Sequence, residues 1–144
     1  LDDWARLWGL TLQIPANWPF AAATAATAMV AADRAGHGMR FALAVFRACF
    51  SAGADINDPG TLSQCAADAG LNIEAFASQL NDPQNTEVVQ GNTLELIRRG
   101  GFGTPTMFVG KELFFGNDRV PLVEWTLGPI GDDEFVLPGQ HSKI

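Results

Sequence analysis

The sequence predicts an α/β fold in which a long helical region precedes a β-hairpin and one further helix. Two observations support this order. Over residues 1–100, apolar residues recur at helical spacing and all but one of the runs end at a glycine. After that, two short apolar runs flank Gly110-Lys111, which is typical of a tight hairpin. We expect a helical domain over 1–100, a ββα part over 101–130 and an irregular tail over 131–144.

The helical region contains start and stop signals of several kinds. Asp58 and Asp82 each precede a proline, and proline is favoured in the first helical turn. Asn72 is the expected N-cap of the helix that follows it. Residues 10–14, "LTLQI", read instead as a short strand-like segment. The expected helices cover residues 2–8, 21–35, 39–52, 59–69, 73–80 and 83–99.

The C-terminal part opens with Thr104-Pro105, continues through the hairpin and ends in a helix with Pro121 in its first turn. This order is that of the C-terminal ββα half of a thioredoxin-like fold, in which the proline is cis. Such a turn would expose the backbone of Thr104 to an extended, peptide-like ligand. A plain strand start is the alternative interpretation of Thr104-Pro105.

Composition excludes several classes of function. The formal net charge of −7 argues against a nucleic-acid-binding surface, which normally carries a basic excess. The uncharged run from Ile14 to Ala32 is too weakly apolar for a membrane span. Cys49 and Cys65 form no C-x-x-C motif. We expect both to be reduced core residues, which favours a cytoplasmic protein.

The string "GGFGTPTMFVGKELFFGNDRVPLVEWTL" resembles the C-terminal signature of the 2-hydroxychromene-2-carboxylate isomerase family. That family is related to kappa-class glutathione transferases and to DsbA-like oxidoreductases. "IPANWPF" followed by an Ala-rich helix resembles the family's entry into its helical domain. The resemblance implies a thioredoxin-like fold with an inserted all-helical domain, and a homodimer.

The resemblance also implies an activity. Members bind glutathione as a cofactor and isomerise a small aromatic carboxylate in aromatic-hydrocarbon degradation, by reversible thiol addition. The family's glutathione-activating serine lies in a first βαβ part, which we expect to precede Leu1. No serine of this chain lies in a matching context, so we assign no catalytic residue.

The other half of the glutathione site maps onto this chain by the same resemblance. The implied cofactor-binding residues are Thr104, Pro105, Gly116, Asn117 and Asp118. In this assignment Thr104 pairs through its backbone with the cysteinyl part of glutathione, and Asn117 and Asp118 meet the γ-glutamyl end. Gly116 permits close approach of a backbone. Helix capping is the alternative role for Asn117 or Asp118.

Four other residues are considered for a role: Trp18, Arg119, His37 and His141. Trp18 is expected either to line a pocket for the aromatic substrate or to pack in the core. Arg119 is expected at the surface. His37 and His141 have no partners at metal-ligand or triad spacing, so no metal site is predicted.

Three rival functions remain open at this stage. They are a kappa-like glutathione S-transferase, a DsbA-like thiol-disulfide oxidoreductase, and a non-enzymatic protein that binds a thiol peptide or a partner protein. The oxidoreductase would need a C-x-x-C that this chain lacks.

Overall fold

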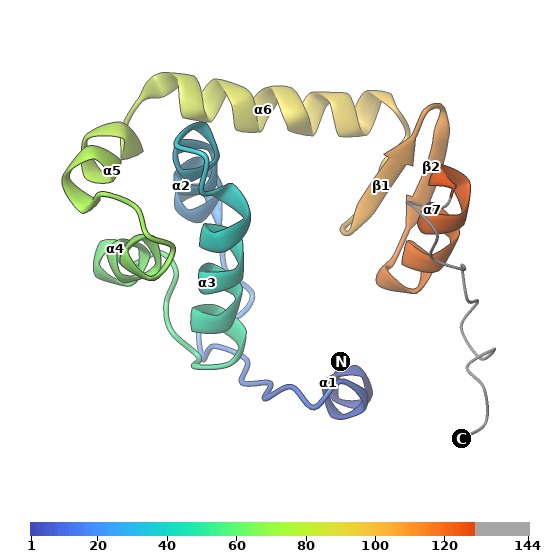
Figure 1. Cartoon of the computed structure of the whole chain (residues 1–144), viewed down its shortest axis with the longest axis horizontal. Helices are drawn as coiled ribbons and strands as arrows, with labels where there is room; N and C mark the ends of the chain where they lie inside the picture. The colour runs from blue at the N-terminus through green and yellow to red at the C-terminus, as the bar shows by residue number, and fades with distance from the viewer. Residues whose placement is uncertain (129–144) are drawn as a thin grey trace. The chain divides into compact units, whose positions relative to one another are not determined.

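The computed structural model describes residues 1–128, so the expected tail over 131–144 lies outside the described residues. The chain divides into two compact units, Leu1–Gly91 and Asn92–Ile144, here called the helical unit and the hairpin unit. The division falls inside a helix rather than after residue 100. The elements in Figure 1 are α1 (Asp2–Leu7), α2 (Ala23–Arg34), α3 (Gly38–Phe50), α4 (Pro59–Asp68), α5 (Ile73–Leu80), α6 (Pro83–Arg98), β1 (Thr106–Val109), β2 (Glu112–Phe115), η1 (Asn117–Arg119) and α7 (Val120–Leu127).

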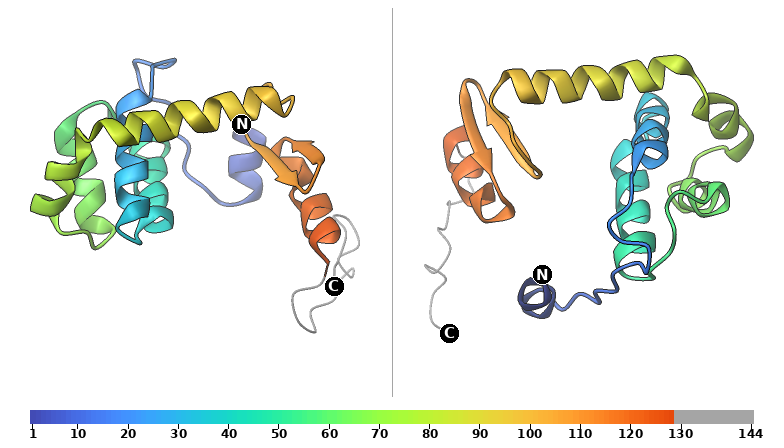
Figure 2. Two further views of the ribbon diagram at one scale, coloured as in Figure 1. Left: turned by 90° about the horizontal axis from the view of Figure 1, so that it is seen from above. Right: turned by 180° about the vertical axis from the view of Figure 1, so that it is seen from behind.

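The core of the helical unit lies among α2, α3, α4 and α5, which gather together in both views of Figure 2. Alanines on one face of α2 are buried and allow its backbone to approach α3 closely. Phe41 and Phe76 pack with ring centroids 5.3 Å apart. Cys49 and Cys65 are buried free thiols in the same cluster, which confirms their expected core positions. Desolvation is the main reason that the pKa of each thiol is raised.

The predicted helix starts at residues 58 and 72 are confirmed. The Asp58 carboxylate accepts a hydrogen bond from the Thr61 N–H at 2.8 Å, and Pro59 occupies the first turn of α4. The Asn72 side chain accepts from the Ala75 N–H at 2.9 Å at the start of α5. Each side chain satisfies one of the N–H groups that a helix leaves unpaired at its start.

A buried polar cluster joins α2 to the start of α6. Asn85 is 1% exposed, and its side-chain oxygen accepts a hydrogen bond from Arg34 Nη1 at 2.9 Å. Its Nδ2 donates to the carbonyl of Gln79 at 2.8 Å. Arg34 also pairs with the Asp82 carboxylate at 3.3 Å. The amide of Asn85 is therefore satisfied on both sides, as burial of a polar group requires.

The prediction of a strand over residues 10–14 is wrong, since this segment has no regular secondary structure. Two hydrogen bonds attach it to the end of α3. Gln13 N–H donates to the Phe50 carbonyl at 2.6 Å, and Ser51 Oγ donates to the Thr11 carbonyl at 3.2 Å. A strand needs a ladder of such bonds to a neighbouring strand, and the two described strands, β1 and β2, pair only with each other.

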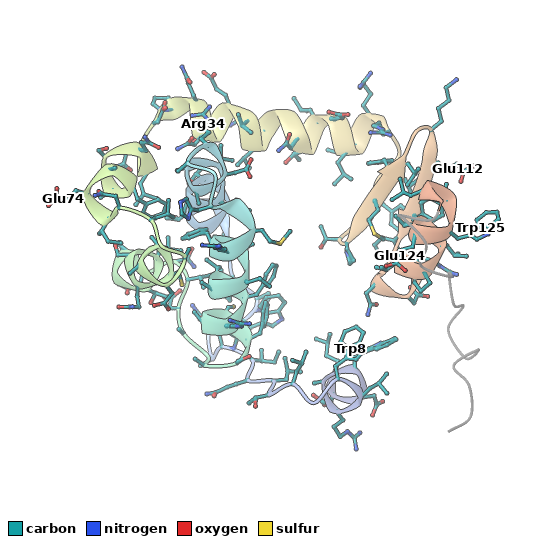
Figure 3. The ribbon with its side chains drawn as sticks, in the orientation of Figure 1. Trp8, Arg34, Glu74, Glu112, Glu124 and Trp125 are labelled. Atoms are coloured by element: carbon teal, nitrogen blue, oxygen red, sulfur yellow. The ribbon has the colours of Figure 1, made fainter. Side chains whose placement is uncertain are left out.

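Helix α1 leaves its apolar side chains exposed. Trp4 and Trp8 contact each other with ring centroids 5.0 Å apart, and α1 contains no buried residue. Trp8 projects from α1 in Figure 3, and the side chain is 57% exposed. The position of α1 therefore depends on the segment that follows it rather than on core packing.

The hairpin unit contains the predicted hairpin. Strands β1 and β2 pair antiparallel with Val109 opposite Glu112, which leaves Gly110-Lys111 as a two-residue turn. Gly110 has a φ of +59°, so the turn uses the left-handed conformation that glycine adopts without steric cost. Arg99 Nη2 donates to the Gly110 carbonyl at 2.7 Å. The same guanidinium lies 3.8 Å above the ring of Phe108, so one side chain ties the turn to the end of α6.

Candidate functional site

The site predicted from the sequence begins where the chain enters β1. The Thr104–Pro105 peptide bond is cis, as expected. Both residues are exposed. In the described part of the chain, neither the N–H nor the C=O of Thr104 has a hydrogen-bond partner. Thr106 Oγ1 donates to the Gly103 carbonyl at 2.6 Å, which closes a tight bend around the two residues. Thr104 thus presents an unpaired donor and acceptor at the end of a strand.

The second segment of the site leaves β2 and enters the last helix. Gly116 has a φ of +103° and a ψ of 151°, a conformation open essentially to glycine alone. A Cβ placed there would lie 2.5 Å from Asp118 Oδ1, so the Asp118 side chain folds back over the bare glycine. The N–H groups of Asn117 and Asp118 open η1, where a helix has no internal acceptors for them. This turn therefore combines a carboxylate with two backbone N–H groups that have no partner in the part of the chain that the structure describes.

The interpretation of Asn117 or Asp118 as a side-chain cap is wrong. The residue before η1 is Gly116 and the residue before α7 is Arg119, and neither position has a side-chain capping hydrogen bond. Arg119 is exposed and lies 3.7 Å from the Asp118 carboxylate, as the surface assignment expected. An exposed pair of this kind contributes little to stability and leaves the carboxylate accessible.

One hydrogen bond brings the two segments together. The Gly116 N–H donates to the Pro105 carbonyl at 3.0 Å, one step beyond the ladder in which Thr106 faces Phe115. All five predicted residues therefore lie at the open end of the hairpin, in one unit. The site presents backbone donors and acceptors and one carboxylate.

Trp18 packs in an aromatic group in the helical unit. Its ring lies 5.4 Å from that of Phe20 and 5.7 Å from that of Phe50, centroid to centroid. The side chain remains 51% exposed, so it covers this cluster from the outside. The Trp18–Pro19 bond is cis, which the sequence analysis missed.

The other polar candidates have structural partners. His37 Nδ1 lies 2.9 Å from the Ala69 carbonyl and joins the start of α3 to the end of α4. Ser51 Oγ and Ser78 Oγ each donate to a backbone carbonyl rather than to a side-chain base. His141 lies outside the described residues.

Two further observations limit what the described residues can do. In residues 1–128 no three His, Cys, Asp or Glu side chains gather around a common metal position. Nor does any helix of this part of the chain have the length and apolar character needed to cross a bilayer.

Comparison with known proteins places these features in a family. The model of the DSBA-like thioredoxin domain matches residues 1–128. A 2-hydroxychromene-2-carboxylate isomerase from Sphingobium xenophagum is 30% identical over 124 residues, covering 86% of this chain and 63% of the relative. One from Pseudomonas putida is 29% identical over 128 residues, covering 89% of this chain and 62% of the relative.

A solved structure agrees with the sequence matches. The structure of a 2-hydroxychromene-2-carboxylate isomerase superimposes with a TM-score of 0.71 at 27% identity, covering 88% of this chain and 62% of that chain. The chain thus spans less than two thirds of the length of these relatives. The match covers both the helical unit and the described hairpin unit, including the cis Pro105 turn. The chain belongs to the family of DSBA-like thioredoxin domains.

Proposed function

We propose that the hairpin unit binds glutathione and that the protein is a glutathione-dependent isomerase of the 2-hydroxychromene-2-carboxylate type. The observation that carries the binding proposal is the unpaired backbone of Thr104 beside the Gly116–Asp118 turn. The reaction class rests on the names of relatives at 29–30% identity, both called 2-hydroxychromene-2-carboxylate isomerase.

The residues present fit a γ-glutamyl tripeptide. An extended peptide needs one N–H and one C=O on the protein for each residue that it pairs with, and Thr104 offers both. The γ-glutamyl end carries an α-carboxylate and an α-ammonium. The N–H groups at the start of η1 would bind the carboxylate, and the exposed Asp118 carboxylate would pair with the ammonium.

Glycine at position 116 serves the same arrangement. Because Asp118 Oδ1 occupies the place of a Cβ, the carboxylate lies against the backbone next to the two η1 donors. A side chain at position 116 would displace the carboxylate from this place. When bound, glutathione would supply a thiol able to add reversibly to an unsaturated substrate. The chain's own contribution is to bind and orient the peptide.

The binding proposal is tested by calorimetry with the full chain and two ligands, glutathione and N-acetylglutathione, which lacks the α-ammonium. We expect glutathione to bind at least tenfold more tightly, because a hydrogen-bonded charge pair contributes about 1.5–3 kcal/mol. The Asp118→Asn variant should bind both ligands equally. Glu124→Gln on α7 removes one exposed negative charge in the same unit and should keep the preference.

Two results would contradict the assignment. One is equal affinity of the unmodified chain for both ligands. The other is an equal loss of preference in the Asp118 and Glu124 variants, which would indicate a general effect of charge. The reaction class is tested separately, by following the conversion of 2-hydroxychromene-2-carboxylate to its ring-opened isomer. An isomerase leaves the glutathione concentration unchanged, whereas a transferase consumes it.

A further inference from the structure

A second candidate site lies in the helical unit, far along the chain from the hairpin. A hollow of about 690 Å³ is bordered by the N-terminal segment, by one face of α3 and by Asp68 of α4. Its volume is within the range of pockets that hold small organic molecules. The lining residues on the N-terminal segment are Gly9, Leu10 and Thr11.

Two arginines of α3 line this hollow. Arg40 and Arg47 are seven residues apart, so they share one face of the helix with their Cα atoms roughly 10 Å apart along its axis. Within residues 1–128 neither guanidinium forms an ion pair or a hydrogen bond with another side chain. Asp68 shares the hollow, but its carboxylate accepts a hydrogen bond from Gln64 at 2.9 Å and pairs with neither arginine.

The surface between the two arginines is apolar. Leu43 and Ala44 lie between them on the same face of α3, and Ala48 continues this face beyond Ala44. Leu43 is 48% exposed, so this floor is accessible. Arg40 and Arg47 therefore place two unpaired cations beside an exposed apolar floor. Such a surface is complementary to an anion with an apolar body.

Hydrogen bonds hold the walls of the hollow together. Ser51 Oγ donates to the Thr11 carbonyl at 3.2 Å, and Gln13 N–H donates to the Phe50 carbonyl at 2.6 Å. Both bonds attach the N-terminal segment to the end of α3. The hollow is therefore built by tertiary contacts within the helical unit.

We propose that this hollow binds a small organic acid, with its apolar body on Leu43 and Ala44 and its carboxylate on Arg40 or Arg47. The guanidinium fork matches a carboxylate in bidentate geometry. This inference goes beyond the proposed function and does not depend on it, because the glutathione contacts belong to the hairpin unit.

The test uses two probes of the same shape, 2-naphthoate and neutral 2-naphthamide. Calorimetry with the full chain at low salt should give at least tenfold tighter binding of the acid. In the Arg40→Gln/Arg47→Gln variant the two probes should bind with affinities within twofold of each other. The matched control is Arg98→Gln/Lys111→Gln, which removes two positive charges from the hairpin unit and should keep the tenfold preference.

A second readout locates the probe. Adding 2-naphthoate to the ¹⁵N-labelled chain should shift the amide signals of Thr11, Ala44 and Ser51 and leave those of β1 unchanged. If the double variant loses its helical circular dichroism, the preference for the acid is measured in each single variant, where we expect it to fall at least threefold.

Several outcomes would overturn the proposal. These are no binding of 2-naphthoate, equal affinity for the acid and the amide, an equal loss of preference in the control variant, or amide shifts confined to the hairpin unit. Failure of the glutathione test would leave the expected naphthoate result unchanged. The two proposals therefore fail separately.

Discussion

Replacement of Gly116 by alanine tests how the turn after β2 is built. The backbone there has φ +103° and ψ 151°. Holding a non-glycine residue in this region costs roughly 3 kcal/mol. The new Cβ would also lie 2.5 Å from Asp118 Oδ1, so the carboxylate must leave its rotamer at a cost of about 1 kcal/mol. We expect Gly116→Ala to destabilise the hairpin unit by about 3–4 kcal/mol.

The control is Gly110→Ala in the turn between β1 and β2. Gly110 also has a positive φ, +59°, but a Cβ there meets nothing within 4 Å. The left-handed helical region is less costly for alanine, so we expect a loss of about 1 kcal/mol. Hydrogen exchange of the β1 and β2 amides, measured by NMR in both variants, reports the local opening free energy. Losses that agree within about 1 kcal/mol would refute the reasoning about the turn.

Three further predictions concern the helical unit and the helix that leaves it. Gly91→Ala should raise the free energy of unfolding by about 1 kcal/mol in urea titrations, because Gly91 is an exposed helical position with nothing within 4 Å of its Cβ site. Asn85→Ala should lower it by about 2–4 kcal/mol, since two buried hydrogen bonds are lost, one of them from the charged Arg34 guanidinium; an unchanged urea midpoint would contradict this. Hydrogen bonds from the N–H and hydroxyl of Thr61 lower the pKa of Asp58 in the folded state. The ionised Asp58 therefore contributes its full stabilisation above the unfolded pKa, about 3.9, and this stabilisation is lost as pH falls through the lower folded pKa. The thermal midpoint should therefore fall less on acidification in Asp58→Asn than in the unmodified chain, and equal slopes would exclude this group.

Much of the fold could be predicted because its signals are local. Pro59 after Asp58, and Asn72 before an apolar run, specify helix starts through bonds to residues three positions away. The two-residue turn at Gly110 is likewise set by its own backbone. The strand predicted over residues 10–14 is wrong for the opposite reason. The alternation of apolar and polar side chains there favours a strand, but a strand needs a partner strand, which only the tertiary structure can supply.

The candidate site could likewise be predicted from the sequence only in part. The Thr104-Pro105 bend and the Gly116 turn carry short sequence signals, whereas their hydrogen bond depends on the register of the hairpin. The burial of Asn85 could not be predicted, because its partners Arg34 and Gln79 come from two other segments. The seven-residue spacing of Arg40 and Arg47 is a sequence signal for the hollow in the helical unit. No sequence signal indicates that Gly9, Leu10 and Thr11 also line it.

The position of Arg99 has a spectroscopic consequence. Its guanidinium carbon lies 3.8 Å from the centre of the Phe108 ring, so the Arg99 side-chain protons lie in the shielding cone of an aromatic ring current. Their NMR signals should move upfield only when the end of α6 and the hairpin turn are in contact, because the bond to the Gly110 carbonyl holds the cation there. The chemical shifts of the Arg99 side chain thus report, without an added label, whether the hairpin turn contacts the end of α6. They can be followed while glutathione or 2-naphthoate is titrated.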